Sequence, residues 1–326
     1  REVRRKAGSL RVRLREPLSE LVAGESIAIS GVCLTLEAAA GLLPGCDQVF
    51  AYDKRRADRG LLGLWRMGQR LKSFAPDLAV VSHSSPRSGA LAWLSGARRR
   101  VGYAPFCTER IRRDGRLPFA EQMLAAAVAA GAEGGDLRLE LAGPPDPEGY
   151  AERLLAGAPG PVVGLVPGAE WATKRWGPEK YAVLAERLCG RGATVVLLGG
   201  PADRDTSARI AELARAPVRD TSGNSIAEAL AVLARCDLVV GGDSGLVHCA
   251  RGLRRPTVMI FGPTDPGRHR FGPGEEPVRL GLDCQPCHPH GPRRCPLGHH
   301  HCMTLLSAQA VAEVALALLD APARAS

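Results

Sequence analysis

Residues 238–266 read LVVGGDSGLVHCARGLRRPTVMIFGPTDP, and this stretch indicates the fold of the chain. The apolar run Leu238–Val240 ends in a Gly-rich turn, a helix is expected to open at Ser244, and a second apolar run follows at Thr257–Phe261. In α/β folds, a strand followed by a small-residue loop, the start of a helix and a second strand presents backbone N–H groups and a helix dipole to a phosphate. Taken alone, the same pattern is equally compatible with a plain βα turn.

Two further apolar runs end in turns of the same kind. Val162–Val166 runs into PGAEWATKRWGP, and Ala193–Leu198 runs into GGPAD. Because ligands of open parallel sheets bind beyond the carboxyl ends of the strands, all four loops should line one crevice. Their cationic and short polar side chains favour a phosphorylated, nucleotide-bearing ligand. These side chains are Lys174, Arg175, Ser244, Thr264 and Asp265.

The same motifs carry a resemblance to a known family. PGAEWATKRWGPEKYAVLAERL, LLGGP, DSGLVHCA and FGPTDP look like the heptosyltransferases of glycosyltransferase family 9. The tail CQPCHPHGPRRCPLGHHHCM resembles that of the lipopolysaccharide heptosyltransferase II type. The resemblance spans about residues 40–326 and implies an α/β fold of the GT-B type, with two Rossmann-like domains facing a cleft. It implies inverting transfer of L-glycero-D-manno-heptose from ADP-heptose to the lipopolysaccharide inner core, with no cofactor or metal in the chemistry.

The resemblance also implies a donor site in the second half of the chain. By this resemblance, Lys174 would pair with the diphosphate, and the Ser244-Gly245 turn and Thr264 would bind the same group. His248, one turn into the helix, would face the same pocket. Each position has a simpler interpretation, since His248 could be a core histidine and Lys174 part of a solvated basic edge.

Two acidic residues and one loop complete the predicted site. The resemblance implies that Asp203 lies near the ribose. Asp243 could bind a sugar hydroxyl or simply cap the helix that begins after it. On the acceptor side, the loop with Arg87 and Ser88 would face the lipopolysaccharide core, although a basic surface turn explains it equally well.

The rest of the chain predicts two α/β units. Alternating helical and apolar strand patterns lie on both sides of the Gly- and Pro-rich segment Gly157–Pro161, which is the predicted boundary. The expected domains are therefore residues 39–157 on the acceptor side, incomplete, and residues 158–326 for the nucleotide sugar. The expected elements of the first are strands at Gln48–Tyr52, Leu78–Val81 and Arg100–Tyr103, helices at Gly60–Lys72, from Ser88 through Leu94, and at Leu117–Ala130, and an extended segment at Leu137–Leu141.

Charge and hydropathy limit the choice of partner and compartment. The net charge is +9, yet no nucleic-acid-binding motif or stacking-aromatic pattern accompanies it, so nucleic acid is not an expected partner. No signal peptide and no apolar run long enough to cross a bilayer are found. We therefore expect a cytoplasmic protein, with at most a peripheral, charge-driven contact with the inner membrane surface.

Four of the ten cysteines form a cluster near the C-terminus. Cys284, Cys287, Cys295 and Cys302 are separated by two, seven and six residues, with several histidines between them. One Cys-x2-Cys pair is a recurrent half of a tetrahedral zinc site, so a structural zinc is one interpretation. A loop with free thiols is the other.

The N-terminus resembles a different family. Residues 24–36, GESIAISGVCLTL, look like the first barrel of riboflavin synthase, so residues 1–38 are predicted to be a β fragment of that type, and lumazine binding is an alternative function. This fragment stands where the heptosyltransferases have the Gly-Asp loop that carries their general base. No Gly-Asp pair occurs before residue 130, so the catalytic residue is not identified. A chimera that binds ADP-sugar without turnover therefore stays open.

Overall fold

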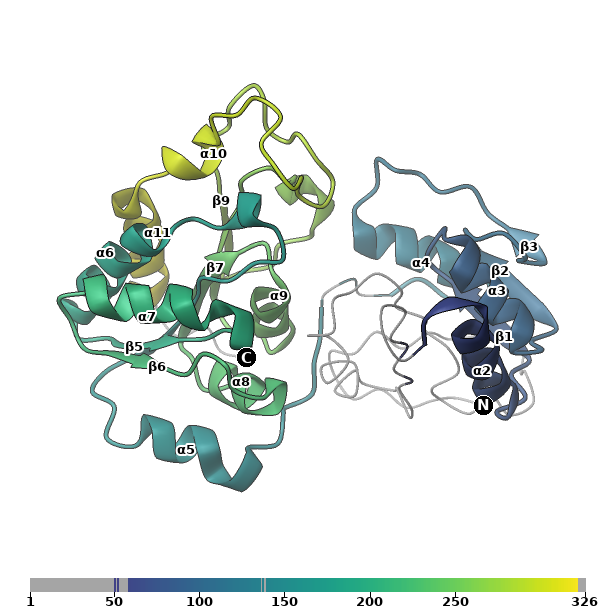
Figure 1. Ribbon diagram of the computed structural model, residues 1–326, viewed down its shortest axis with the longest axis horizontal. Coiled ribbons are helices and arrows are strands. Elements are labelled where there is room, and N and C mark those ends of the chain that lie inside the picture. Colours follow the sequence, from purple (N-terminus) through teal and green to yellow (C-terminus); the bar gives the residue numbers. More distant parts are fainter. Residues whose placement is uncertain (1–49, 51, 53–57, 136, 138, 322–326) are drawn as a thin grey trace. The chain divides into compact units, whose positions relative to one another are not determined.

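The structure is a computed structural model that describes residues 50, 52, 58–135, 137 and 139–321 (Figure 1). The riboflavin-synthase-like fragment at 1–38 lies outside the described residues, and so does most of the strand predicted at 48–52. The chain divides into two compact units, Arg1–Arg138 with Arg268–Arg270, and Leu139–Gly267 with Phe271–Ser326. This division lies earlier in the chain than the Gly157–Pro161 turn, because the intervening helix α5 (Tyr150–Leu155) packs on α8 (Ile226–Leu233) of the second unit.

The first unit contains a three-stranded parallel sheet in the order β1-β2-β3. Leu78 pairs with Arg99 and Val81 with Gly102, and a Cβ at Gly102 would lie 2.0 Å from the Val81 carbonyl oxygen, so no larger residue fits there. The predicted helix Gly60–Lys72 and strand Leu78–Val81 are confirmed. The elements are β1 (Leu78–Val81), β2 (Arg99–Gly102), β3 (Glu109–Arg110), α2 (Gly60–Lys72), α3 (Pro86–Leu94) and α4 (Phe119–Ala129).

The extended segment predicted at Leu137–Leu141 joins no strand in its described residues. Instead, the Leu141 N–H donates to the carbonyl of Gly252 at 2.7 Å. The segment is therefore tied to the end of a helix in the second unit and does not extend a sheet.

The second unit is a doubly wound sheet of six parallel strands in the order β6-β5-β4-β7-β8-β9. The chain runs from the central β4 outward to β6, then returns to β7 beside β4 and continues outward to β9. A ligand is expected at the point where the strand order reverses, between β4 and β7. The strands are β4 (Val162–Val166), β5 (Thr194–Leu197), β6 (Val218–Asp220), β7 (Leu238–Gly242), β8 (Thr257–Ile260) and β9 (Glu275–Val278).

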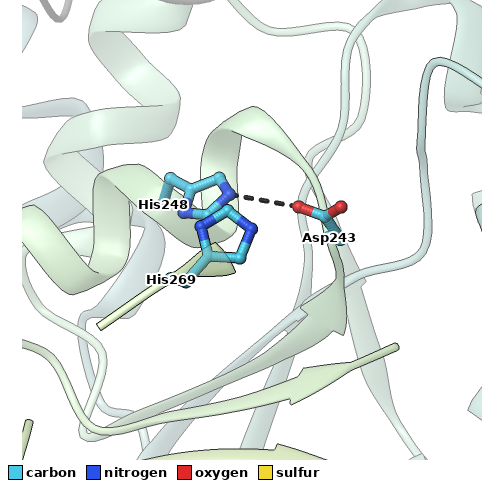
Figure 2. A group of neighbouring side chains, drawn as sticks. All are labelled: Asp243, His248 and His269. Carbon is cyan, nitrogen blue, oxygen red and sulfur yellow. Dashed lines mark hydrogen bonds and ion pairs between the residues drawn. The ribbon is translucent and has the colours of Figure 1, made fainter. Parts of the chain in front are cut away.

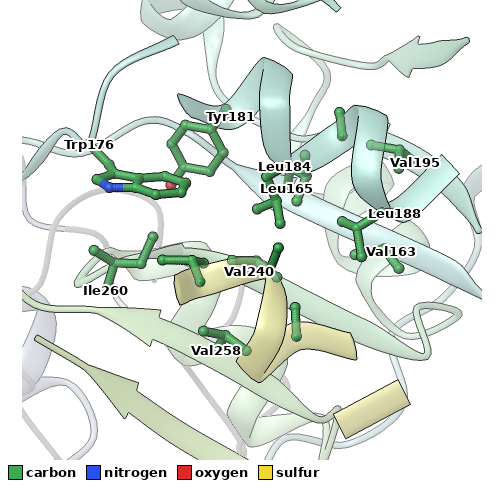
Figure 3. Close-up of a cluster of buried hydrophobic side chains, with 14 of the residues drawn as sticks. Val163, Leu165, Trp176, Tyr181, Leu184, Leu188, Val195, Val240, Val258 and Ile260 are labelled. Carbon is green, nitrogen blue, oxygen red and sulfur yellow. The ribbon is translucent and has the colours of Figure 1, made fainter. Parts of the chain in front are cut away.

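Helices pack against this sheet in two groups, α11 with α6 and α7, and α9 with α8 and α5. The main core lies beneath the first group, where Leu165, Tyr181, Leu184 and Val240 are almost fully buried (Figure 3). None of the described helices is long and apolar enough to cross a membrane. The remaining bounds are α6 (Pro178–Cys189), α7 (Arg204–Leu213), α9 (Gly245–Gly252), α10 (His301–Thr304) and α11 (Ala308–Asp320), with 3-10 turns η1 (Pro147–Gly149), η2 (Ala172–Lys174), η3 (Pro201–Asp203) and η4 (Pro266–Arg268).

Candidate ligand-binding site

The predicted site lies at the carboxyl ends of β4 and β7, where the strand order reverses. Lys174 ends η2 in the loop after β4, and Asp243 follows β7 directly. Since Val166 and Gly241 are register partners, the two loops start side by side. The Lys174 Nζ lies 2.7 Å from Asp243 Oδ2 and 3.3 Å from the Asp243 carbonyl oxygen. Only 12% and 10% of the two side chains are exposed, so this is a largely buried ion pair.

The Asp243 carboxylate is held by three side chains. Oδ2 also accepts a hydrogen bond from Thr264 Oγ1 at 2.9 Å, and Oδ1 lies 3.2 Å from His248 Nε2 (Figure 2). Burial acts to raise the pKa of Asp243, but the bond from His248 and the charge of Lys174 outweigh it and hold the pKa well below the usual range of an aspartate. Asp243 is therefore ionised at neutral pH, and the helix-capping interpretation is wrong, because Ser244 occupies the N-cap of α9.

Arg251 determines which nitrogen of His248 carries the proton. Arg251 Nη1 lies 3.3 Å from His248 Nδ1. A guanidinium group can only donate, so Nδ1 must accept and the ring proton must lie on Nε2, facing Asp243. Arg251 is itself buried and paired with Glu275 Oε2 at 2.9 Å. His248 is thus bonded to charged groups on both sides, and its contact with a ligand stays a prediction.

His269 is the third side chain in Figure 2. It belongs to the short stretch Arg268–Arg270 that groups with the first unit, and it is not part of the site as we define it. The two potential metal ligands of the site itself are Asp243 and His248, and both are engaged in the contacts described above.

The start of α9 offers hydrogen-bond donors beside this cluster. Ser244, the N-cap residue, has an extended backbone, and its side chain makes no capping bond. Its Oγ is buried and has no hydrogen-bond partner within the described part of the chain. The N–H groups of the first helical turn, beginning at Gly245, have no partner within the helix by construction. A hydroxyl and a helix N-terminus together form a suitable site for an anion.

Asp203 lies at the same edge, one strand further out. It ends η3 after β5, and its Oδ2 accepts a hydrogen bond from the Gly200 N–H at 3.0 Å. A Cβ added to Gly168 would lie 2.3 Å from Asp203 Oδ1, so the glycine allows the loop after β4 to approach this carboxylate. Asp203 therefore contacts the backbone of the loop after β4, and its contact with a ribose stays a prediction.

Two other polar residues of the predicted set have local structural roles. Arg175 Nε donates to the Ala169 carbonyl at 3.1 Å, which folds the guanidinium back on its own loop. Asp265 Oδ1 accepts from the Gly267 N–H at 2.9 Å and closes a turn. Of the adjacent cations, Lys174 is the one that contacts Asp243.

Arg87 and Ser88 lie in the first unit, at the start of α3. Arg87 is exposed, whereas the Ser88 side chain is buried and its N–H donates to Ser85 Oγ at 3.1 Å. The Ser85 hydroxyl therefore caps this helix. Ser88 is largely engaged in that cap, and an acceptor-side role for the loop stays a prediction that depends mainly on Arg87.

Sequence comparison relates the chain to one family. The profile described as Glycosyltransferase family 9 (heptosyltransferase) matches residues 64–301. Lipopolysaccharide heptosyltransferase 1 of Pseudomonas aeruginosa is 35% identical over 244 residues, which are 69% of this chain and 66% of the relative. Lipopolysaccharide heptosyltransferase 2 of Escherichia coli is 37% identical over 112 residues, 32% of each chain. The matched regions thus span from about a third to just under two thirds of these relatives.

Solved structures show the same fold. A family 9 glycosyltransferase from Veillonella parvula superposes with a TM-score of 0.75 at 20% identity, covering 87% of this chain and 86% of the other. The E. coli ADP-heptose lipopolysaccharide heptosyltransferase II gives a TM-score of 0.65 at 23% identity, covering 88% and 87%. At these identities the likeness establishes the α/β architecture of the GT-B heptosyltransferase structures, which confirms the predicted fold class.

Proposed function

Because the chain belongs to glycosyltransferase family 9 (heptosyltransferase), we propose that it transfers L-glycero-D-manno-heptose from ADP-heptose to the inner core of lipopolysaccharide, with inversion. The observation that carries the proposal is the cluster of Lys174, Asp243, His248 and Thr264 beside the unbonded Ser244 hydroxyl. This cluster lies at the strand-order reversal, where doubly wound sheets bind nucleotides.

Counting donors supports a diphosphate ligand at this site. An ammonium group has three N–H donors. Asp243 oxygens accept from Lys174 Nζ at 2.7 and 3.3 Å, which leaves one donor for a ligand. Since the ion pair is neutral overall, attraction for an anion must come mainly from the helix N-terminus at Ser244 and its dipole. Asp243 then orients Lys174 toward the ligand.

The proposed nucleotide is supported by what solved structures of the same fold contain. A solved E. coli heptosyltransferase structure contains ADP, and another is described by its ADP-heptose donor. We extend this donor class to the present chain. Lys174 and the N–H groups of α9, without a metal, would stabilise the diphosphate as it leaves the anomeric carbon.

The acceptor and the compartment are part of the same proposal. A nucleotide-sugar donor and a net charge of +9 support a cytoplasmic protein that contacts the anionic inner membrane surface at its periphery. The exposed Arg87 at the start of α3 is the proposed contact with the acidic lipopolysaccharide core. The base that deprotonates the acceptor hydroxyl is not assigned.

The test compares two adjacent cations. Lys174→Gln removes the charge that faces the site, and Arg175→Gln removes a charge that faces the Ala169 carbonyl. Calorimetric titration should show ADP and ADP-heptose binding weakened by about 1.5–3 kcal/mol, or about 10- to 150-fold, in Lys174→Gln. Arg175→Gln should bind as the wild type does. Equal affinities for all three proteins would remove Lys174 from the site.

A further inference from the structure

The four cysteines near the C-terminus differ in burial. Cys302 is buried, Cys284 and Cys295 are half-buried and Cys287 is exposed. Among the described residues, no group of three potential metal ligands within 4.8 Å of one another includes a cysteine. The zinc and the free-thiol interpretations therefore both stay predictions.

Helix α2 of the first unit presents large apolar side chains to solvent. Leu61, Leu62 and Trp65 are 84%, 58% and 53% exposed. Because residues three and four positions apart are neighbours on an α-helix, Trp65 lies beside both leucines on one side of the helix. Single exposed apolar residues are ordinary on protein surfaces, whereas several gathered on one side mark a surface that meets a partner. We call these three residues the apolar face of α2.

The opposite side of α2 is fixed within the first unit. Gly63, Met67 and Gly68 are the buried residues of the helix. A Cβ added to Gly68 would lie 2.4 Å from Leu94 Cβ, so the glycine lets α2 lie directly on α3. Since this side packs on the fold, the apolar face points away from it. The exposure of that face therefore follows from how α2 is packed.

The surroundings of the apolar face are basic. Arg66 lies four residues after Leu62, and it is exposed. Lys72, also exposed, lies two helical turns after Trp65, so the two cations border the face. Helix α2 contains no acidic residue, and residues 59–100 contain eight Lys and Arg side chains but one acidic side chain. Trp and Leu on a helix with Lys and Arg beside them are typical of helices that lie in the surface of an anionic membrane.

The size and charge of this surface favour a membrane over a second copy of the chain. A specific protein interface covers about 800 Å² on each partner, far more than three side chains can provide. Two copies of the same face would also bring Arg66 and Lys72 of one chain against the same cations of the other. A membrane surface needs no such area, and its anionic headgroups attract the cations.

We propose that the apolar face of α2 docks on an anionic membrane, with Leu61, Leu62 and Trp65 in the boundary between headgroups and acyl chains, and with Arg66 and Lys72 against the lipid phosphates. The proposal rests on the peripheral membrane contact proposed above, and not on the donor or acceptor assigned to the chain. One apolar side chain that leaves water should improve membrane partition about 10-fold, and one cation at the surface about fivefold. The affinity is thus a product of several weak contributions that single substitutions can remove.

The first experiment measures cosedimentation of the full chain with vesicles. Phosphatidylcholine vesicles that contain phosphatidylglycerol should bind the wild type, and binding should weaken at high salt and on pure phosphatidylcholine. Leu62→Ser should weaken binding about 10-fold, and Arg66→Gln about fivefold. The matched controls are Leu305→Ser and Arg187→Gln, which change a 59% exposed leucine and an exposed arginine of the second unit and should bind as the wild type does.

Three outcomes would overturn the docking surface. A wild type that binds no vesicles would remove the membrane contact itself. Equal binding by Leu62→Ser and Leu305→Ser would place the contact on another part of the chain. A concentration-dependent dimer that Leu62→Ser abolishes in sedimentation velocity would assign the face to a second copy. Titration with ADP is independent of all three, so the donor proposal is judged separately.

A second experiment locates the contact with a variant that still binds. Bromine atoms on the upper part of the lipid acyl chains quench the fluorescence of a tryptophan that enters the boundary. Trp65→Phe keeps an apolar ring and should bind brominated anionic vesicles, but the lipid-dependent quenching should be smaller than in the wild type. Equal quenching in the two proteins would show that Trp65 stays in water, and would overturn the proposed insertion.

Discussion

Replacing Asp243 by asparagine tests how the buried charges of the site are balanced. The change keeps the shape of the side chain and removes its charge. Lys174, with only 12% of its side chain exposed, then lacks the carboxylate 2.7 Å away, and Thr264 and His248 lose their charged acceptor. An uncompensated buried charge is among the few changes that cost several kcal/mol.

The magnitude can be estimated from burial. Removing one partner of a buried ion pair costs about 3–5 kcal/mol. The asparagine carbonyl still accepts one hydrogen bond, and the pair is not completely sealed, so the lower end applies. We expect the free energy of unfolding to fall by about 3 kcal/mol. The exposed pair Arg191–Asp320, whose side chains are 56% and 63% exposed, is the matched control, and Asp320→Asn should cost less than about 1 kcal/mol.

Urea unfolding of the two single variants and of the double variant Lys174→Met/Asp243→Asn is the assay. If the loss in Asp243→Asn reflects a stranded ammonium group, removing that group as well should restore stability to within about 1 kcal/mol of the wild type. The double variant should nevertheless bind ADP about 10- to 150-fold more weakly than the wild type, since the ligand-facing cation is gone. Equal costs for Asp243→Asn and Asp320→Asn would refute the reasoning, and so would a double variant as unstable as Asp243→Asn.

Two further predictions concern stability. The pKa of Asp243 is lower in the folded state than its unfolded value of about 3.9, so the stability that its ionised form contributes is complete above about pH 4 and is lost as the pH falls toward the folded pKa. In urea titrations at decreasing pH, the free energy of unfolding should therefore fall more steeply for the wild type than for Asp243→Asn, and parallel curves would contradict this. Ser225→Ala should cost about 1 kcal/mol, because Ser225 and Glu228 form a reciprocal capping box at the start of α8, with bonds of 3.2 and 2.9 Å; a thermal unfolding midpoint equal to that of wild type would exclude the cap as a source of stability.

The sequence predicts the strands that are buried on both faces and misses those at the edges. Val162–Val166 and Thr257–Ile260 are fully buried and read as continuous apolar runs. The edge strands β6 (Val218–Asp220) and β9 (Glu275–Val278) are half-exposed and contain charged residues, so no apolar run marks them. Hydropathy detects burial and only indirectly detects strand pairing, which explains both outcomes.

The residues of the candidate site likewise fall into those that the sequence predicts and those that it does not. Its loops were predictable because small residues follow each apolar run. Small residues are needed there for a steric reason, since a Cβ at Gly241 would lie 2.8 Å from the Val166 carbonyl oxygen. The role of Arg251 was not predicted, although its position three residues after His248, on the same helix face, is a usable signal. Its partner Glu275 is distant in sequence and looks like an ordinary surface charge, so only the fold connects them.

Strand β9 and residue Arg251, which the sequence analysis did not identify, are connected in the fold. Glu275 on β9 holds Arg251, Arg251 holds His248, and His248 and Lys174 hold Asp243, so one chain of charged contacts crosses β9, α9, β7 and η2. The inner members Arg251, His248 and Asp243 each contact a neighbour on both sides. An apolar residue in place of Glu275 would make β9 easier to recognise from sequence but would leave Arg251 without its carboxylate. Glu275 therefore has two effects: its charge lowers the apolar content of β9, and its carboxylate holds Arg251 behind His248.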